Sequence, residues 1–273
     1  MTDGERWTRV ELARLRDGGW RPRVWLELLW AAQIQANRTR RRRPALARQA
    51  GEWMLAGAAT WLIVARLLPA SPFARRRRQG LIWWGVCALM LDWHLGMLES
   101  PDGRAARLGA ADALTLARAW LVPAVAERGD PAMLLLGALT DVADGPVARV
   151  TRTTRFGRDL EGVIDGCFAA AALQGAVRGG GVSRLHANVE RARLVAGTGF
   201  TCTVYFAAGR APDPAVRLSG RRTGAVRVAG LMAGGLGHRT LANQLLLTSS
   251  AAALAELLRH PERRRAVAAA GRR

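Results

Sequence analysis

Four carboxylic acids lie within a short stretch of this 273-residue chain, at spacings that suit metal binding: Asp141, Asp144, Glu161 and Asp165. In a helix, residues three or four positions apart lie on one face, so the first two acids share one face and the last two share another. Apolar runs flank both pairs, and charged groups there are costly unless a cation joins them. Because oxygen ligands suit hard ions such as Mg²⁺ or Mn²⁺ rather than zinc, the spacing predicts two helices that hold one or two hard cations.

Small and basic residues accompany the acids at fixed positions: Gly145, Ala148, Arg149 and Gly157. With them, the stretch resembles the motif of the CDP-alcohol phosphatidyltransferase family. That motif reads Asp-x-x-Asp-Gly-x-x-Ala-Arg, a gap of seven or eight residues, and then Gly-x-x-x-Asp-x-x-x-Asp. One position departs from it, since Glu161 stands where the family usually has aspartate. A glutamate still offers a carboxylate to a metal, but from a backbone displaced by one methylene group.

The resemblance implies a phosphotransferase that moves a phosphatidyl group from a CDP-linked lipid, with CDP-diacylglycerol the expected donor, to an alcohol, releasing CMP. It also implies that the four acids hold two Mg²⁺ or Mn²⁺ ions, which neutralise the phosphate charge. Asp165 is further expected to act as the general base that removes the proton of the acceptor hydroxyl. The arginine-rich loops suit an anionic acceptor, glycerol phosphate or inositol phosphate, and the sequence does not choose between them.

A second group of polar residues lies upstream, at Asp112, Thr115 and Arg118. Family members often open the corresponding helix with Asn-x-x-Thr-x-x-Arg, so the aspartate departs from the pattern and the other two residues match. The resemblance implies contacts to the cytidine diphosphate from these residues and from the small and basic residues of the motif: Asp112, Thr115, Arg118, Gly145, Ala148 and Arg149. The alternative is a helix-capping aspartate with an arginine that extends to the membrane surface.

Three further arginines are candidates for holding the phosphate of an anionic acceptor: Arg152, Arg155 and Arg221. The first two belong to a short basic loop expected at 151–156, and the third belongs to a basic, proline-containing loop expected at 210–222. Guanidinium groups suit this role because they bind phosphate through paired hydrogen bonds. Arg152 and Arg155 are equally consistent with loop charges that face lipid headgroups.

The elements that must position these residues are helices. The resemblance covers the chain from residue 109 onward and implies an all-α, polytopic membrane protein with a six-helix catalytic core at 109–259. The six helices are expected at 111–126, 131–150, 157–177, 193–208, 223–237 and 240–258. Both halves of the motif, the 210–222 loop and the basic tail at 260–273 then fall on the cytoplasmic side of the plasma membrane.

Two segments precede this core. Residues 1–50 are charged and carry an aromatic, apolar patch at 24–30. The patch is either an amphipathic helix on the membrane surface or a short packed helix, and the sequence favours neither. The segment 51–100 holds two apolar runs, at 53–69 and 81–98, which are expected to form a pair of helices.

Arginine runs indicate how these segments lie. The run at 38–43 is expected to face solvent or lipid headgroups. Six arginines at 38–48 outnumber four at 75–78, so the positive-inside rule favours a spanning hairpin of the two apolar runs with both ends in the cytoplasm. At 17 and 18 residues both runs are short for spanning, and a pair that lies at the interface is the alternative.

Composition agrees with a membrane protein. The chain is 50% hydrophobic with a net charge of +20, and it has no lysine, so all 41 basic residues are arginines. These arginines cluster beside apolar runs, as they do in cytoplasmic loops, and nucleic acid is therefore not the expected partner. All ten tryptophans lie at or before Trp120, several near the ends of apolar runs, which fits interfacial anchoring.

Oligomeric state and alternative functions follow from the same resemblance. The family is typically homodimeric, and the pattern Gly162-x-x-x-Gly166 offers a close-packing face for a partner chain or for another helix of the same chain. Two other interpretations stay open. One is a family member that has lost catalysis, since Asp112 and Glu161 both depart from the usual residues, and the other is an arginine-rich membrane adaptor.

Overall fold

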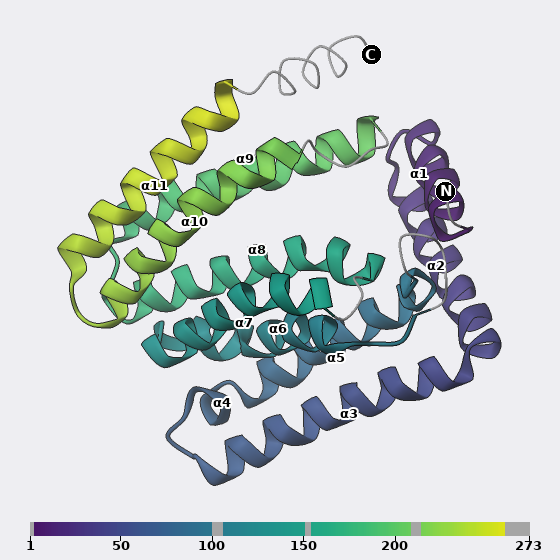
Figure 1. The fold of residues 1–273 in the computed structure, drawn as a ribbon, viewed down its shortest axis with the longest axis horizontal. Coiled ribbons are helices and arrows are strands. Elements are labelled where there is room, and N and C mark those ends of the chain that lie inside the picture. Colours follow the sequence, from purple (N-terminus) through teal and green to yellow (C-terminus); the bar gives the residue numbers. More distant parts are fainter. Residues whose placement is uncertain (1–2, 100–105, 151–153, 209–213, 260–273) are drawn as a thin grey trace. The chain divides into compact units, whose positions relative to one another are not determined.

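The computed structural model describes the backbone of residues 3–99, 106–150, 154–208 and 214–259, and within these ranges the side chains at 3, 148–149, 155–159, 207–208 and 214–222 lie outside the description. All regular structure in the described ranges is helical, which confirms the all-α prediction (Figure 1). In chain order the helices are α1 (Asp3–Asp17), α2 (Pro22–Arg42), α3 (Pro44–Leu67), α4 (Pro72–Arg75), α5 (Arg77–Trp93), the 3-10 helix η1 (Leu95–Met97), α6 (Ala110–Arg128), α7 (Pro131–Val150), α8 (Arg155–Arg178), α9 (Arg184–Ala208), α10 (Pro214–Gly235) and α11 (Arg239–Arg259).

The chain divides into two compact units. The first comprises Met1–Val125 and Leu136–Phe168, and the second comprises Ala126–Leu135 and Ala169–Arg273. The division passes through α6, α7 and α8 rather than between helices. All four acids of the motif and the upstream polar residues belong to the first unit, so their mutual geometry is that of a single packed body.

In the first unit, α3 and α5 pack through tryptophan rings laid over glycines. A Cβ on Gly57 would lie 2.3 Å from the ring of Trp84, and a Cβ on Gly80 would lie 2.1 Å from the ring of Trp61. The indole N–H of Trp84 donates to the carbonyl of Met54 at 2.7 Å. Both tryptophans are buried inside the unit, because each fills the space that a missing side chain leaves. These two rings are therefore core residues and not interfacial anchors.

A proline inside α6 helps to join that helix to the α3–α5 pair. Pro123 has no backbone N–H, so the carbonyl of Ala119 loses its helical partner. The indole N–H of Trp83 donates to that carbonyl at 2.8 Å. The indole N–H of Trp120 in turn donates to the carbonyl of Gly57 at 2.9 Å. Indole donors thus fix α6 against α5 and α3 at two separate points.

The acid-bearing part of α8 packs against α6 and α5 through a shared apolar cluster. Ile164 is 4% exposed and lies in one buried cluster with Leu116 and Ala119 of α6 and with Cys87 of α5. Asp165 directly follows Ile164 in the helix, so packing of the isoleucine also determines where the carboxylate lies. The apolar side of α8 therefore positions its acidic side.

The arginine run that ends α2 is partly structural. Arg43 is half-buried and donates to the carbonyls of Leu98 at 2.9 Å and Ala106 at 2.6 Å. Gln49 and Leu108 exchange two hydrogen bonds of 3.1 Å each. The expectation that the whole run faces solvent or headgroups is thus wrong for Arg43. Its guanidinium instead donates hydrogen bonds to two backbone carbonyls that lie outside the helices.

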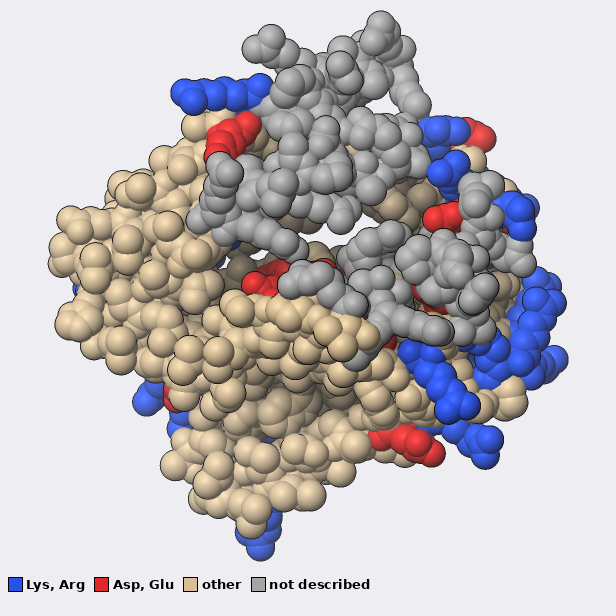
Figure 2. Space-filling view, in the orientation of Figure 1, with Lys and Arg blue, Asp and Glu red and all other residues tan. Residues whose placement is uncertain are grey.

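The aromatic patch near the chain start lies on α2 and faces outward. Its most exposed side chains are Leu26 at 67% and Trp30 at 69%. Figure 2 shows arginine side chains gathered at the right edge of the molecule, where α2 lies in Figure 1. Val24 and Leu28 of the same patch are half-buried, so the patch has an exposed side and a partly packed side, and both alternatives stay open.

In the second unit, two helices begin earlier than expected. The helix expected from residue 193 begins at Arg184, because the hydroxyl of Ser183 accepts the N–H of His186 and caps it. The loop expected at 210–222 is helical from Pro214 onward. A proline fits the first turn of a helix, where its missing N–H has no partner to lose, so the residue assigned to a loop instead starts α10.

A buried ion cluster ties together α9, α10 and α11. Glu190 is 1% exposed, and Arg193 donates to both of its carboxylate oxygens at 2.7 Å. Arg227 places its Nε 2.9 Å from Glu190, and Ser250 donates to the same carboxylate at 2.7 Å. A buried carboxylate needs such partners, so this cluster aligns the three helices of the second unit.

Two segments among the described residues are long and apolar enough to cross a membrane: Leu160–Arg178 and Arg239–Arg259. They belong to α8 and α11, two of the helices expected in the catalytic core. The apolar runs expected at 53–69 and 81–98 are not among them.

Candidate metal centre

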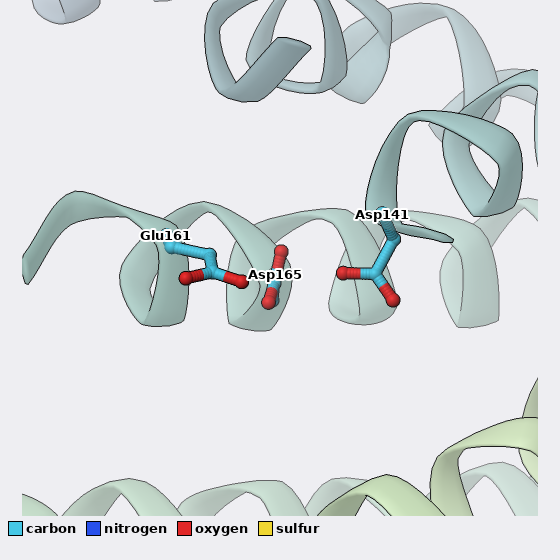
Figure 3. Close-up of side chains that lie close together, drawn as sticks. All are labelled: Asp141, Glu161 and Asp165. Carbon is cyan, nitrogen blue, oxygen red and sulfur yellow. The ribbon is translucent and has the colours of Figure 1, made fainter. Parts of the chain in front are cut away.

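Three of the four acids come together between α7 and α8 (Figure 3). Asp141, Glu161 and Asp165 each offer a carboxylate oxygen, and these oxygens all lie within 4.8 Å of one another. Asp141 is exposed, and the other two are half-buried. The grouping confirms that the two halves of the motif face each other, because one acid comes from the first half and two come from the second.

The fourth acid, Asp144, is not part of this triad. Asp144 is 6% exposed, and its Oδ2 accepts a hydrogen bond from the hydroxyl of Thr115 at 3.2 Å. Through Thr115 and Asp144, the upstream polar residues of α6 contact the first half of the motif. Asp144 as a metal ligand stays a prediction, and in this structure one of its carboxylate oxygens accepts a hydrogen bond from α6.

An arginine from α6 enters the acidic cluster. Arg118 is 1% exposed, its Nη1 lies 3.5 Å from Asp141 Oδ1, and the same nitrogen donates to Asp165 Oδ1. Its Nη2 lies 3.8 Å from Asp144 Oδ2, and its Nε donates to the hydroxyl of Thr140 at 3.3 Å. The guanidinium is therefore an internal cation that contacts three of the four motif acids.

The aspartate of the upstream group performs a structural role. Asp112 is 2% exposed, and it accepts the backbone N–H of Gly109 at 2.9 Å and the hydroxyl of Thr154 at 2.8 Å. An acid that reaches back three residues at a helix start is a capping arrangement, so the capping alternative applies to Asp112. It does not apply to Arg118, whose guanidinium is buried among carboxylates instead of extending to the surface.

The remaining candidate residues are less completely described. Gly145 lies in α7 and is half-buried next to Asp144. The other candidates lie outside the described residues or have side chains that do: Ala148, Arg149, Arg152, Arg155 and Arg221. Of these, Arg221 falls within α10 and not in a loop, because that helix begins at Pro214.

The triad fits a hard divalent cation. Its donors are all carboxylate oxygens, which Mg²⁺ and Mn²⁺ prefer. Oxygens on opposite sides of Mg²⁺ are about 4.2 Å apart, from a metal–oxygen distance of about 2.1 Å, so a spread of at most 4.8 Å closes by small side-chain rotations. A single guanidinium, that of Arg118, is shared among the carboxylates of Asp141, Asp144 and Asp165.

Comparison of the chain with known protein families, with characterised proteins and with solved structures gives no match.

Proposed function

We propose that this chain is a metal-dependent CDP-alcohol phosphatidyltransferase. The observation that carries the proposal is the convergence of Asp141, Glu161 and Asp165, from two helices and at motif positions, to within 4.8 Å. A sequence motif alone does not require its halves to meet, whereas a metal centre does. The contacts of Thr115 with Asp144 and of Arg118 with Asp165 add support, since Thr115 and Arg118 both match the upstream pattern.

The proposed reaction is attack by an alcohol oxygen on the lipid-side phosphorus of a CDP-linked lipid. A new phosphorus–oxygen bond forms to the alcohol, the bond to CMP breaks, and CMP leaves with that electron pair. Asp165 accepts the proton of the attacking hydroxyl, the role that the resemblance implies for it. Bound Mg²⁺ or Mn²⁺ would be held by the triad with Asp144, and it supplies positive charge for the diphosphate oxygens.

The proposal includes a membrane setting. The apolar segments Leu160–Arg178 and Arg239–Arg259 support it by length and composition. We propose that the chain is a multi-pass plasma-membrane protein whose active site faces the cytoplasm, with lipid tails in the bilayer and the polar acceptor arriving from water. The exposed apolar side chains of α2 and the neighbouring arginines suit the surface of such a bilayer.

A homodimer is part of the same proposal. Among the described residues, no atom lies within 4 Å of a Cβ placed on Gly162 or Gly166. The pattern Gly162-x-x-x-Gly166 on α8 thus has room for close helix packing, and we propose that a second copy of the chain packs there.

The test is CMP release from CDP-diacylglycerol by the purified full chain, with Mg²⁺ or Mn²⁺ and a panel of alcohols that includes glycerol phosphate and inositol phosphate. We expect Asp141→Asn and Asp165→Asn each to lower the rate by at least about 100-fold, because a metal ligand or general base is lost. Glu256→Gln, at an exposed acid of α11 outside the cluster, is the control and should retain the rate. Full activity in either aspartate variant would contradict the proposal.

A further inference from the structure

We propose that the chain before the expected core positions the metal centre, through a line of hydrogen bonds that runs from Gln49 of α3 to Asp112 and Thr154. This inference rests on the proposed function and adds three positioning residues to it. Their role is to hold the start of α8 against the start of α6, and not to contact the metal or the donor. The affinity of the acidic triad for a divalent cation should therefore depend on them.

The line begins on α3, outside the expected core. Gln49 donates to the carbonyl of Leu108 at 3.1 Å and accepts the backbone N–H of the same residue at 3.1 Å. Leu108 is also buried in one apolar cluster with Leu46 of α3. Gly109 follows directly, and its backbone N–H donates to Asp112 Oδ2 at 2.9 Å. Polar and apolar contacts from α3 thus hold the segment from which α6 begins.

The line continues from α6 to the segment between the two halves of the motif. Asp112 Oδ1 accepts the hydroxyl of Thr154 at 2.8 Å, and both side chains are buried. Capping of α6 uses only Oδ2 of Asp112, so the second oxygen makes a separate contact with a residue 42 positions away. Thr154 directly precedes α8, the helix that carries Glu161 and Asp165. Because a buried carboxylate that loses a partner is costly, this pair holds the start of α8 in place.

The other half of the motif is held by the same helix. One turn further along α6, the hydroxyl of Thr115 donates to Asp144 Oδ2 at 3.2 Å. Helix α6 therefore contacts α7 through Thr115 and the segment before α8 through Asp112. The triad needs this alignment, because Asp141 comes from α7 whereas its two partners come from α8. Groups behind metal ligands orient those ligands, and their loss typically lowers metal affinity by about 10–100-fold.

The experiment titrates Mn²⁺ into the purified full chain without donor, follows binding by electron paramagnetic resonance, and records a thermal unfolding midpoint for each variant. Thr154→Val keeps the shape of the side chain and removes the hydroxyl, so the affinity for Mn²⁺ should fall by about tenfold or more. Thr154→Ser keeps the hydroxyl and should retain the wild-type affinity. Gln49→Leu should also lower the affinity, whereas Gln79→Leu, at an exposed glutamine of α5, should leave it unchanged.

Variants of Asp112 separate positioning from direct contact. Asp112→Asn keeps an oxygen for the N–H of Gly109 and offers an amide N–H to the hydroxyl oxygen of Thr154, so it should retain the affinity for Mn²⁺. Asp112→Leu loses both bonds and should lower that affinity. A metal ligand at this position would lose affinity in Asp112→Asn, and a residue that contacts only the nucleotide would leave donor-free affinity unchanged in Asp112→Leu. Either result would overturn the inference.

Gln49→Leu, at a half-buried residue, keeps the test decisive if the variants at the buried residues fail to fold. Wild-type affinity in folded Thr154→Val or in Gln49→Leu, or a loss of affinity that Thr154→Ser shares, would overturn the inference. If CMP release by the wild type is intact, such a result contradicts the inference alone. The expected affinities without any CMP release from CDP-diacylglycerol would contradict the proposed function alone, and a wild type that binds no Mn²⁺ would contradict both.

Discussion

Glu161 reaches the same cluster as two aspartates although its side chain is longer by one methylene group. It comes from α8 one turn before Asp165, and its carboxylate oxygen joins the triad at a spacing of at most 4.8 Å. The departure from the expected aspartate therefore does not remove the acid from the site. Asp141 comes from the neighbouring helix α7, while Glu161 and Asp165 both come from α8 (Figure 3).

If Glu161 is a ligand, its charge matters more than its length. We expect Glu161→Asp to retain Mn²⁺ binding and activity, and Glu161→Gln to weaken Mn²⁺ binding by at least about tenfold, since altering even the groups behind a metal ligand costs 10–100-fold. Titration of Mn²⁺ binding by electron paramagnetic resonance measures this. Equal affinities of Glu161→Gln and the wild type would show that Glu161 is not a ligand.

The acids themselves were predictable from sequence, but their partners were not. The spacing of Asp141, Glu161 and Asp165 predicted a shared site, and the structure brings them together. The burial of Arg118 was not predictable, because a helical arginine beside apolar residues more often extends to the surface. The sequence predicted the capping role of Asp112 as one of two alternatives, and the hydrogen bond that Asp112 accepts from the backbone N–H of Gly109 agrees with it.

At the scale of elements, the site depends on the packing of α3, α5 and α6 behind it. Gly80 accepts the ring of Trp61, which also lies edge-on to Trp120 of α6 with ring centroids 5.2 Å apart. The helix that carries Thr115 and Arg118 is therefore supported by aromatic rings from a segment outside the proposed catalytic core. A larger residue in place of Gly80 should therefore lower the stability of the whole first unit.

Gly80→Ala tests this packing. Its Cβ would lie 2.1 Å from the Trp61 ring, and overpacking of this kind costs about 1–3 kcal/mol, so the thermal unfolding midpoint in detergent should fall. Gly85→Ala is the matched control in α5, because no described atom lies within 4 Å of its Cβ. Alanine is the better helix former, so the control should be neutral or slightly stabilising. Equal midpoints for the two variants would refute the packing argument.

Helix positions in the proposed core were largely predictable, and the errors have local causes. The expected helices at 111–126, 131–150 and 240–258 agree with α6, α7 and α11 to within two residues. The starts of α9 and α10 were missed because Ser183 and Pro214 are residues that both end loops and begin helices. Apolar periodicity alone does not separate those two roles.

At the scale of the molecule, the sequence predicted an all-helical chain and the structure has one, but the organisation into two units was not foreseen. The expected core at 109–259 has residues in both units, while all four motif acids lie in the first. Packing of the N-terminal helices against α6 and α8 causes this, since the rings of Trp83 and Trp84 and the thiol of Cys87 contribute to the same core. Contacts between residues far apart in the chain produce no periodic pattern in the sequence, so the sequence alone did not predict them.

The central claim is that the acidic cluster holds a hard cation and that this cation contacts the diphosphate of a CDP-linked lipid. Phosphorus-31 electron–nuclear double resonance on Mn²⁺ bound to the full chain, with CDP-diacylglycerol, measures that contact directly. We predict the strong phosphorus coupling of a phosphate oxygen bound to Mn²⁺ in the wild type, and its loss in Asp141→Asn. Bound Mn²⁺ without phosphorus coupling, in a sample that also binds CDP-diacylglycerol, would contradict the claim.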